Sequence, residues 1–231
     1  MMQILDFDPR ANPAAVIDHT LLRPTATAAE MAQLCEEAVE YGFVSVCVPP
    51  RFVPQVAGRL YGSGVLTGTV IGFPLGYASS ETKVFETREA CALGAQEIDL
   101  VIPLGAAIAG EFSSIETEIA RVVAAAKPAP VKVILECCYL SAALKSALAE
   151  IVVAAGAAYV KTSTGFGSGG ATLEDVQLLR QVVAARAGVK AAGGIRDLQG
   201  FEAMRAAGAS RIGTSAGVAI VQAWRLREGL A

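Results

Sequence analysis

The sequence predicts a single (β/α)8 barrel, the α/β fold (TIM barrel) in which eight parallel strands alternate with eight helices. Short apolar or β-branched runs alternate with longer amphipathic runs along all 231 residues. Several strand candidates, such as the one containing residues 131–135, are apolar almost throughout, which is typical of parallel strands covered on both faces. Eight such units in this length favour a closed barrel. A doubly wound open sheet would need fewer strands and usually one dominant glycine-rich loop after the first, which is absent here.

The eight strands are expected in the short apolar runs, at residues 16–21, 44–48, 68–73, 97–102, 131–137, 158–162, 189–192 and 210–213. The longer runs between them predict helices at residues 28–41, 51–61, 79–93, 112–126, 141–155, 173–187, 198–207 and 216–227. Three of these helices begin at a capping residue that is followed three positions later by a polar side chain: Thr27, Ser79 and Thr172. Five glycines stand just past a helix, where a left-handed terminating residue is needed: Gly42, Gly94, Gly156, Gly188 and Gly208.

Composition and charge limit the classes of partner. No linker or charge run marks a second domain, so residues 1–231 are expected to form one domain with residues 1–12 as an N-terminal extension. The formal charge of −3 creates no basic field for nucleic acid or anionic lipid. No stretch has the uninterrupted apolar length of a membrane span, and the N-terminus lacks a signal-peptide pattern. Five irregularly spaced cysteines indicate reduced thiols, so we expect a cytoplasmic protein that binds small molecules.

Charged residues interrupt the apolar strand runs, where a core is expected. Three of the six lysines lie in such runs, and three acidic residues do the same: Lys132, Lys161, Lys190, Asp18, Asp99 and Glu136. Lysine is rarely buried without a partner. A satisfied ion-pair network remains open as an explanation, but buried ion pairs seldom repay their desolvation, which favours a catalytic centre.

Lys161 and Lys190 fit the requirements of a Schiff-base enzyme, which needs a lysine that is often neutral. An ordinary lysine, with a pKa near ~10.4, is almost fully protonated at neutral pH. A second ammonium about 5 Å away would repel the first by about 3 kcal/mol and favour the neutral amine. Lys161 and Lys190 lie on the sixth and seventh predicted strands, which are neighbours in a barrel.

Glycine-rich loops after three consecutive strands point to a phosphate site. Residues 164–170 follow the sixth strand, Gly193 and Gly194 follow the seventh, and residues 213–215 follow the eighth. Glycines let backbone N–H groups approach an anion, and barrels often bind phosphate after strands 7 and 8. One glycine cluster alone is a weak signal, whereas three at the same end of a barrel are more specific.

Motifs across most of the chain resemble those of the deoxyribose-phosphate aldolases. They are Tyr-Val-Lys-Thr-Ser-Thr-Gly-Phe around Lys161, Val-Lys-Ala-Ala-Gly-Gly-Ile-Arg around Lys190, Glu-Ile-Asp-Leu-Val-Ile around Asp99 and Ile-Asp-His-Thr-Leu-Leu around Asp18. Thr-Val-Ile-Gly-Phe-Pro and Arg-Ile-Gly-Thr-Ser also match, in the family's order, and the matches run from residue 18 to residue 215.

The resemblance implies reversible cleavage of 2-deoxy-D-ribose 5-phosphate to acetaldehyde and D-glyceraldehyde 3-phosphate, without a metal or a cofactor. Lys161 would form the Schiff base, Lys190 would lower its pKa, and Asp99 with Lys190 and a water would move protons. The substrate and phosphate residues implied are Asp18, Cys47, Thr164, Gly165, Gly193, Gly194, Gly213 and Ser215. Arg196 is a further contributor at the phosphate, and the resemblance also implies a homodimer.

Three implied roles have alternatives. Lys132 and Glu136 match family positions and are expected to form a pair that orients the proton relay, or else a structural ion pair. Cys47 is either near the substrate or a small buried hydrophobe. His19, the single histidine, fits a structural hydrogen bond better than a relay.

Two departures from the family pattern affect the expectations. Phe166 stands where some members have a lysine near the phosphate, so phosphate binding here should depend on backbone N–H groups. Many members end in a tyrosine that assists proton transfer, whereas the last tyrosine here is Tyr159, which predicts slower turnover. The rival interpretations are a transaldolase-like Schiff-base enzyme and a non-catalytic phosphosugar-binding barrel. The second would lack Lys161, Lys190 or Asp99, and all three are present.

Overall fold

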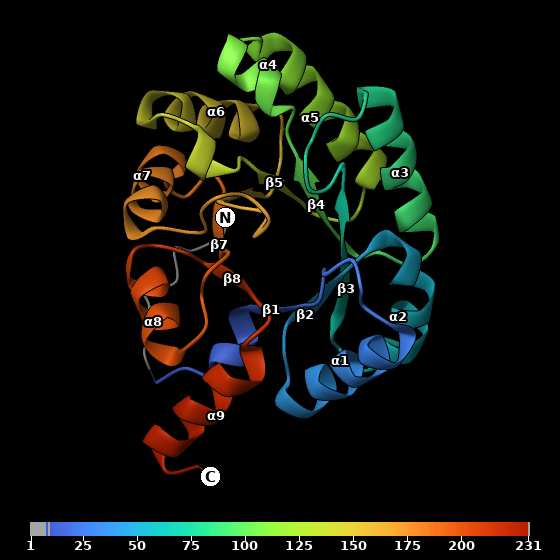
Figure 1. The fold of residues 1–231 in the computed structure, drawn as a ribbon, viewed down its shortest axis with the longest axis vertical. Helices are drawn as coiled ribbons and strands as arrows, with labels where there is room; N and C mark the ends of the chain where they lie inside the picture. The colour runs from blue at the N-terminus through green and yellow to red at the C-terminus, as the bar shows by residue number, and fades with distance from the viewer. Residues whose placement is uncertain (1–7, 9, 231) are drawn as a thin grey trace.

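The computed structural model describes residues 8 and 10–230, which form a closed barrel of eight parallel strands (Figure 1). This confirms the predicted fold. Each strand pairs with the next along the chain and the last pairs with the first. The strands are β1 (Ile17–Thr20), β2 (Ser45–Val48), β3 (Leu66–Ile71), β4 (Glu97–Val101), β5 (Val131–Ile134), β6 (Tyr159–Lys161), β7 (Gly188–Ala192) and β8 (Arg211–Thr214).

Helices surround the barrel and cover the outer face of the strands (Figure 1). They are α1 (Ala28–Tyr41), α2 (Val53–Leu60), α3 (Ser80–Ala92), α4 (Leu104–Ala109), α5 (Phe112–Ala126), α6 (Ala142–Ala154), α7 (Leu173–Val183), α8 (Leu198–Ala206) and α9 (Gly217–Glu228). Three short 3-10 helices precede or follow strands: η1 (Pro13–Val16), η2 (Pro50–Phe52) and η3 (Cys137–Tyr139). Buried apolar residues repeat at helical spacing, as with Ile115, Ile119 and Val122 on α5, so the core lies between helices and strands.

The three predicted capping residues are confirmed. Thr27 accepts a hydrogen bond from the N–H of Glu30, whose carboxylate accepts in return from the N–H of Thr27, and this capping box begins α1. Ser79 and Thr172 cap α3 and α7 in the same N-terminal position. Four of the five predicted left-handed glycines have positive φ angles: Gly42, Gly94, Gly156 and Gly208.

The prediction for Gly188 is wrong. Gly188 lies inside β7, where a Cβ would collide with the ring of Tyr159. Helix α7 ends at Val183 rather than at residue 187, and the residue in the left-handed region is Ala184, with φ 49°. Close packing against the neighbouring strand requires a glycine at this position. The sequence does not show this requirement, because a glycine after a helical run looks the same whether it ends the helix or begins the next strand.

Two further differences concern the segments that follow β4 and β5, at the C-terminal end of the barrel. The short helix α4 between β4 and α5 was not predicted, because six residues are too few to show a helical period. Strand β5 ends at Ile134 rather than at residue 137, since Glu136 turns the chain with φ 54°. Both differences change the shape of loops and leave the strand order as predicted.

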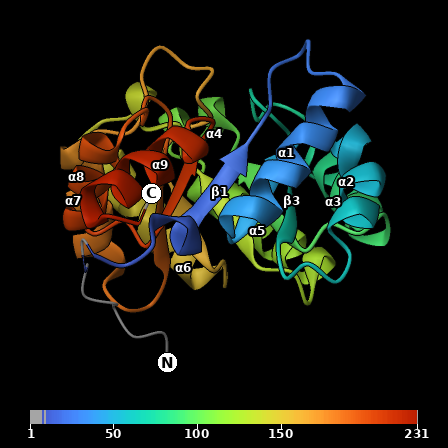
Figure 2. The same ribbon diagram turned by 90° about the horizontal axis from the view of Figure 1, so that it is seen from below.

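All strands point the same way, so their C-terminal ends gather at one end of the barrel. Figure 2 shows β1 pointing toward the end at which the gold loop after β6 protrudes. Most of the expected N-terminal extension, residues 1–12, lies outside the described residues. Within the part that the structure describes, no helix is both long and apolar enough to cross a membrane.

Candidate active site

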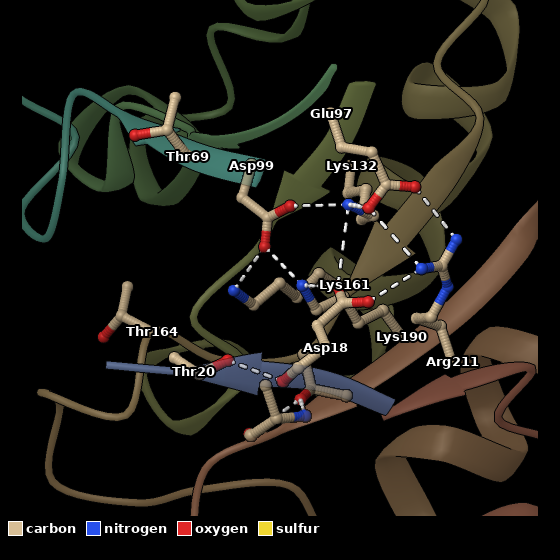
Figure 3. A network of polar contacts seen from close by, with 12 residues as sticks. Asp18, Thr20, Thr69, Glu97, Asp99, Lys132, Lys161, Thr164, Lys190 and Arg211 are labelled. Atoms are coloured by element: carbon tan, nitrogen blue, oxygen red, sulfur yellow. Dashed lines mark hydrogen bonds and ion pairs between the residues drawn. The ribbon is translucent and has the colours of Figure 1, made fainter. Parts of the chain in front are cut away.

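Seven charged side chains meet inside the barrel, where most barrels of this kind carry apolar layers (Figure 3). They come from β1, β4, β5, β6, β7 and β8, and none is more than 8% exposed. We call them the charged cluster: Asp18, Glu97, Asp99, Lys132, Lys161, Lys190 and Arg211. Strand register places them together, because Asp99 is opposite Lys132 and Lys161 is opposite Lys190.

Asp99 lies at the centre of the charged cluster and contacts three lysines. Its Oδ2 lies 2.7 Å from Lys161 Nζ and 2.6 Å from Lys190 Nζ, and its Oδ1 lies 3.1 Å from Lys132 Nζ. Asp18 accepts a second hydrogen bond from Lys190. Lys190 therefore contacts two carboxylates, whereas Lys161 contacts one, that of Asp99, among the described residues.

Glu97 and Arg211 extend the cluster toward the N-terminal ends of the strands. Arg211 donates to Glu97 Oε1 at 2.9 Å and to Asp18 Oδ1 at 2.7 Å. Lys132 Nζ lies 2.7 Å from Glu97 Oε2. Glu97 is two residues before Asp99 on the same strand, so both face the barrel interior. Every carboxylate of the cluster is thus held between at least two cations.

The charge count of the cluster favours a neutral Lys161. Four cations face three carboxylates, so the cluster carries one excess positive charge when every group is ionised. Removal of one proton makes it neutral. A buried set of charges is most stable when it is balanced. Among the four cations, Lys161 has the fewest carboxylate contacts and is the one that can lose its proton at least cost.

The two lysines that face each other have pKa values shifted in opposite directions. Burial lowers the pKa of Lys161; Asp99 opposes this effect and Lys190 adds to it. Burial also disfavours the charge on Lys190, but Asp18 and Asp99 outweigh burial and raise its pKa. Burial opposes ionisation of Asp18 as well, yet Lys190, Lys132 and Arg211 hold its pKa below the usual value. The surroundings therefore favour the neutral amine at Lys161 and the ammonium at Lys190.

Lys161 also lines a cavity of about 420 Å³ at the C-terminal end of the barrel. The loops after β1, β6, β7 and β8 form its walls. Six of the eight residues expected at the substrate are among the lining residues: Thr164, Gly165, Gly193, Gly194, Gly213 and Ser215. Arg196 and Phe166 line it too, as do residues 20–23.

Backbone N–H groups on three of these loops are placed to bind an anion. Within the described residues, the N–H groups of Gly165, Gly194 and Ser215 have no acceptor. The loop after β6 packs tightly on the loop after β7, because a Cβ at Gly170 would collide with the carbonyl oxygen of Gly193. Donors without acceptors at the wall of a polar cavity are what a phosphate group requires.

Two residues expected at the substrate do not line the cavity. Asp18 is fully buried and accepts from Ser45, Lys190 and Arg211. Cys47 is 2% exposed beside the charged cluster, where burial raises the pKa of its thiol to about 11, so the thiol is neutral.

The expected pairing of Lys132 with Glu136 is wrong. Lys132 contacts Glu97 and Asp99, whereas Glu136 accepts hydrogen bonds from Thr164. Lys132 lies on β5, whereas Glu136 lies beyond the end of that strand, and the turn at Glu136 gives it a different partner. His19 makes the structural hydrogen bond expected of it, with Nε2 lying 2.8 Å from Glu37 Oε2.

Glu97, Arg211 and Thr20 were missed as site residues. Glu97 could have been found from its two-residue spacing to Asp99, which places both on one face of the strand. Arg211, at the start of its strand, is another charge in a strand that should be apolar. Thr20 lines the cavity and follows Asp18 by the same spacing. Among the described residues, no group of three His, Cys, Asp or Glu side chains is placed to hold a metal ion.

Comparison with known proteins agrees with this geometry. The family model for DeoC/LacD family aldolases matches residues 14–223. A deoxyribose-phosphate aldolase of Geobacillus sp. is 54% identical over 91% of this chain and 95% of its own length. One from Syntrophotalea carbinolica is 50% identical over 93% of this chain and 97% of its own. The tetrameric structure of deoxyribose phosphate aldolase from Aeropyrum pernix superposes with a TM-score of 0.88 at 35% identity, covering 94% of this chain and 92% of that one. The chain belongs to the DeoC/LacD family of aldolases.

Proposed function

We propose that this chain, as one domain, catalyses the reversible cleavage of 2-deoxy-D-ribose 5-phosphate to acetaldehyde and D-glyceraldehyde 3-phosphate. The observation that carries the proposal is Lys161, a buried amine of lowered pKa that opens onto a cavity with an anion-binding wall. The relatives that share half of its sequence over nearly all of its length carry the name of this activity. An amine and a phosphate site in one cavity fit a phosphorylated aldehyde.

In the proposed mechanism, Lys161 Nζ attacks the aldehyde carbon of the open-chain sugar. Loss of water from the resulting carbinolamine gives an iminium ion, which acts as the electron sink. The bond between C2 and C3 breaks, its electrons enter the iminium to form an enamine, and the C3 hydroxyl loses its proton to become the aldehyde of glyceraldehyde 3-phosphate. Protonation of the enamine at C2 and hydrolysis of the imine release acetaldehyde and restore Lys161.

Asp99 and Lys190 would handle the protons of these steps, with a water between them and the substrate. Asp99 contacts both lysines, so it can pass a proton between the reacting amine and its neighbour. The raised pKa of Lys190 favours an ammonium beside Lys161 before the substrate reacts, and that charge favours the neutral amine. Lys132 supports this arrangement by donating to the other oxygen of Asp99, and Asp18 supports it by accepting a hydrogen bond from Lys190.

The phosphate would bind at Gly165, Gly194 and Ser215, with Gly193 and Gly213 allowing close approach. Each of these residues lines the cavity that holds Lys161. Arg196 adds a side-chain cation to the lining of the same cavity. Cys47 would act on the substrate only through the charged cluster, because it does not line the cavity.

We also propose that the protein is a cytoplasmic homodimer. The five irregularly spaced cysteines, all of them free, support a reducing compartment. Exposed apolar side chains, among them Leu75, Tyr77 and Phe85 in the segment after β3, support association of copies. The Aeropyrum pernix relative is tetrameric. Light scattering coupled to gel filtration measures the assembly directly, and a mass of one or four chains would refute the dimer.

The test of the reaction is product detection with the purified chain. We expect 2-deoxyribose 5-phosphate to give equal amounts of acetaldehyde and glyceraldehyde 3-phosphate, each measured by a coupled dehydrogenase. Fructose 6-phosphate, the type of substrate that a transaldolase uses, should give no three-carbon transfer to an acceptor aldehyde. Transfer from the ketose without cleavage of the deoxysugar would assign the chain to the transaldolase type of chemistry.

A further inference from the structure

Glu136 is a buried carboxylate that the mechanism above does not use. It is 2% exposed and lies between β5 and η3. None of its hydrogen bonds among the described residues reaches Lys161, Asp99 or Lys190. A carboxylate buried away from the cations of the charged cluster needs another reason to be there.

The backbone at Glu136 is in the left-handed conformation, which few residues other than glycine adopt. Its φ is 54° and its ψ is 64°. The N–H of Leu135 donates to the carbonyl of Lys161, and the N–H of Cys137 donates to the carbonyl of Thr162. The two N–H donors are two residues apart in the chain, but the two carbonyl acceptors belong to consecutive residues. Glu136 is therefore an extra residue in the pairing of this segment with β6, as in a β-bulge. Such strain is found where a side chain must be aimed at a functional site.

The side chain of Glu136 holds the first residue of the phosphate-binding loop. Glu136 Oε1 accepts from the N–H of Thr164 at 3.2 Å, and Oε2 accepts from the hydroxyl of Thr164. The oxygen of that hydroxyl accepts in turn from the N–H of Phe166 at 3.0 Å. Figure 3 shows Thr164 apart from the charged cluster, with no interaction joining them. The chain of hydrogen bonds fixes the backbone on both sides of Gly165, whose own N–H is left for an anion.

Packing supports the same role. A Cβ on Gly167 would lie 3.1 Å from Glu136 Cδ, so the loop rests directly on the carboxylate. The far end of the loop is tied to the β7 side, where the N–H of Ala171 donates to the carbonyl of Gly193 at 3.0 Å. The Glu136 carboxylate presents one oxygen to each Thr164 donor, whereas a glutamine in the same pose would present an oxygen to one donor and an NH2 group to the other.

We propose that Glu136 is a positioning residue for phosphate recognition: through Thr164 it holds Gly165 where its N–H binds the phosphate of the substrate. This deepens the proposed function and rests on it. Glu136 then sets the preference for phosphorylated over unphosphorylated sugars and takes no part in proton transfer at Lys161.

The test compares Glu136→Gln with the wild type on 2-deoxyribose 5-phosphate and on 2-deoxyribose. We expect the KM for the phosphorylated sugar to rise about tenfold, as when a hydrogen bond to a charged group is lost. The kcat for that sugar, both constants for 2-deoxyribose and the pH profile should stay unchanged. Borohydride trapping of acetaldehyde on Lys161, which needs no phosphate site, should also be unchanged and checks that the variant is folded. Glu116→Gln, at an exposed position on α5, is the matched control.

Two additional measurements distinguish failure of this proposal from failure of the proposed reaction. Affinity for inorganic phosphate, measured by calorimetry, should fall by the same factor in Glu136→Gln, even if the wild type cleaves neither sugar. Thr164→Val removes the hydroxyl that donates to Glu136 and keeps the backbone N–H, and the double variant should lose no more phosphate affinity than the worse single variant. A fall in kcat on both sugars with a shifted pH profile would place Glu136 in the proton relay and overturn the proposal. Unchanged KM and unchanged phosphate affinity would overturn it too.

Discussion

Two buried lysines in this molecule share burial and a lowered pKa, yet only one has a structure suited to chemistry. Lys161 lies in the charged cluster inside the barrel, and Lys83 lies on α3 among the outer helices. Lys83 Nζ contacts Glu118 Oε1 at 2.6 Å and the carbonyl of Val101 at 3.0 Å. Burial lowers the pKa of Lys83, as it does that of Lys161, although Glu118 opposes the effect.

The difference between them is access and charge balance. Lys83 is 0% exposed, has one carboxylate for its one charge, and does not line the cavity that holds Lys161. Lys161 shares Asp99 with two other lysines and opens onto that cavity. Burial and a lowered pKa therefore do not identify a reactive lysine by themselves. An excess of cations over carboxylates, together with space for a carbonyl compound, makes the distinction.

The largest expected effect follows from replacing each lysine in turn. Lys161→Met should lower kcat/KM for 2-deoxyribose 5-phosphate by more than about a thousandfold, because the nucleophile is gone. Lys83→Met should change kcat/KM by less than about twofold at temperatures where it is folded. A coupled assay at saturating and limiting substrate measures both. Equal losses of kcat/KM in the two variants would show that Lys161 and Lys83 do not differ in their importance for catalysis.

The same Lys83→Met change should instead appear in stability. Glu118 would be left buried without its cation, which typically costs about 3–5 kcal/mol of unfolding free energy. The double variant Lys83→Met/Glu118→Leu should recover most of that loss, because an apolar pair of similar volume removes the unpaired charge. Urea denaturation followed by circular dichroism provides both values. If Lys83→Met is as stable as the wild type, the ion pair between Lys83 and Glu118 is not desolvated in the folded protein.

Removal of the second ammonium tests the charge balance itself. In Lys190→Met, the repulsion that lowers the pKa of Lys161 is lost and Asp99 binds Lys161 more strongly, so the pKa of Lys161 should rise. Less free amine is then present at neutral pH, and the acidic limb of the kcat/KM profile should move to higher pH. The rate at pH 7 should fall about a hundredfold, since proton transfer is impaired as well. A pH–rate profile that keeps its shape would argue against this role for Lys190.

The smallest expected effect comes from removing a carboxylate of the cluster. Glu97→Gln leaves four cations facing two carboxylates, which favours the neutral form of Lys161 more strongly. The acidic limb of the profile should move to lower pH, opposite to its movement in Lys190→Met, with a change at pH 7 within about threefold. Glu116→Gln is the control for loss of one surface charge. A shift to higher pH in Glu97→Gln would contradict the charge count.

Sequence reasoning was most successful where a pattern is local. The order of strands and helices, the caps at Thr27, Ser79 and Thr172, and the lysines at neighbouring strand positions all follow from periodicity and spacing. These signals are carried by residues close together in the chain, so the sequence alone exposes them. The closed fold then brings Lys161, Lys190 and Asp99 together without further information.

Features that depend on contacts between distant segments could not be predicted. Gly188 fits tightly against Tyr159, and nothing in its own neighbourhood distinguishes it from a helix-ending glycine. The turn at Glu136 sends its side chain to Thr164 instead of Lys132. The partners of Arg211 on β1 and β4 lie more than a hundred residues earlier in the chain. In each case tertiary packing, which has no local signature, determines the partner.

Whether Lys161 is the nucleophile can be determined by borohydride reduction in the presence of 2-deoxyribose 5-phosphate and EDTA, followed by peptide mass mapping. We predict one stable adduct, on the peptide that carries Lys161, and none on the peptides that carry Lys83 or Lys190. A folded protein with excess substrate and no adduct, or an adduct on either of those other lysines, would contradict this prediction.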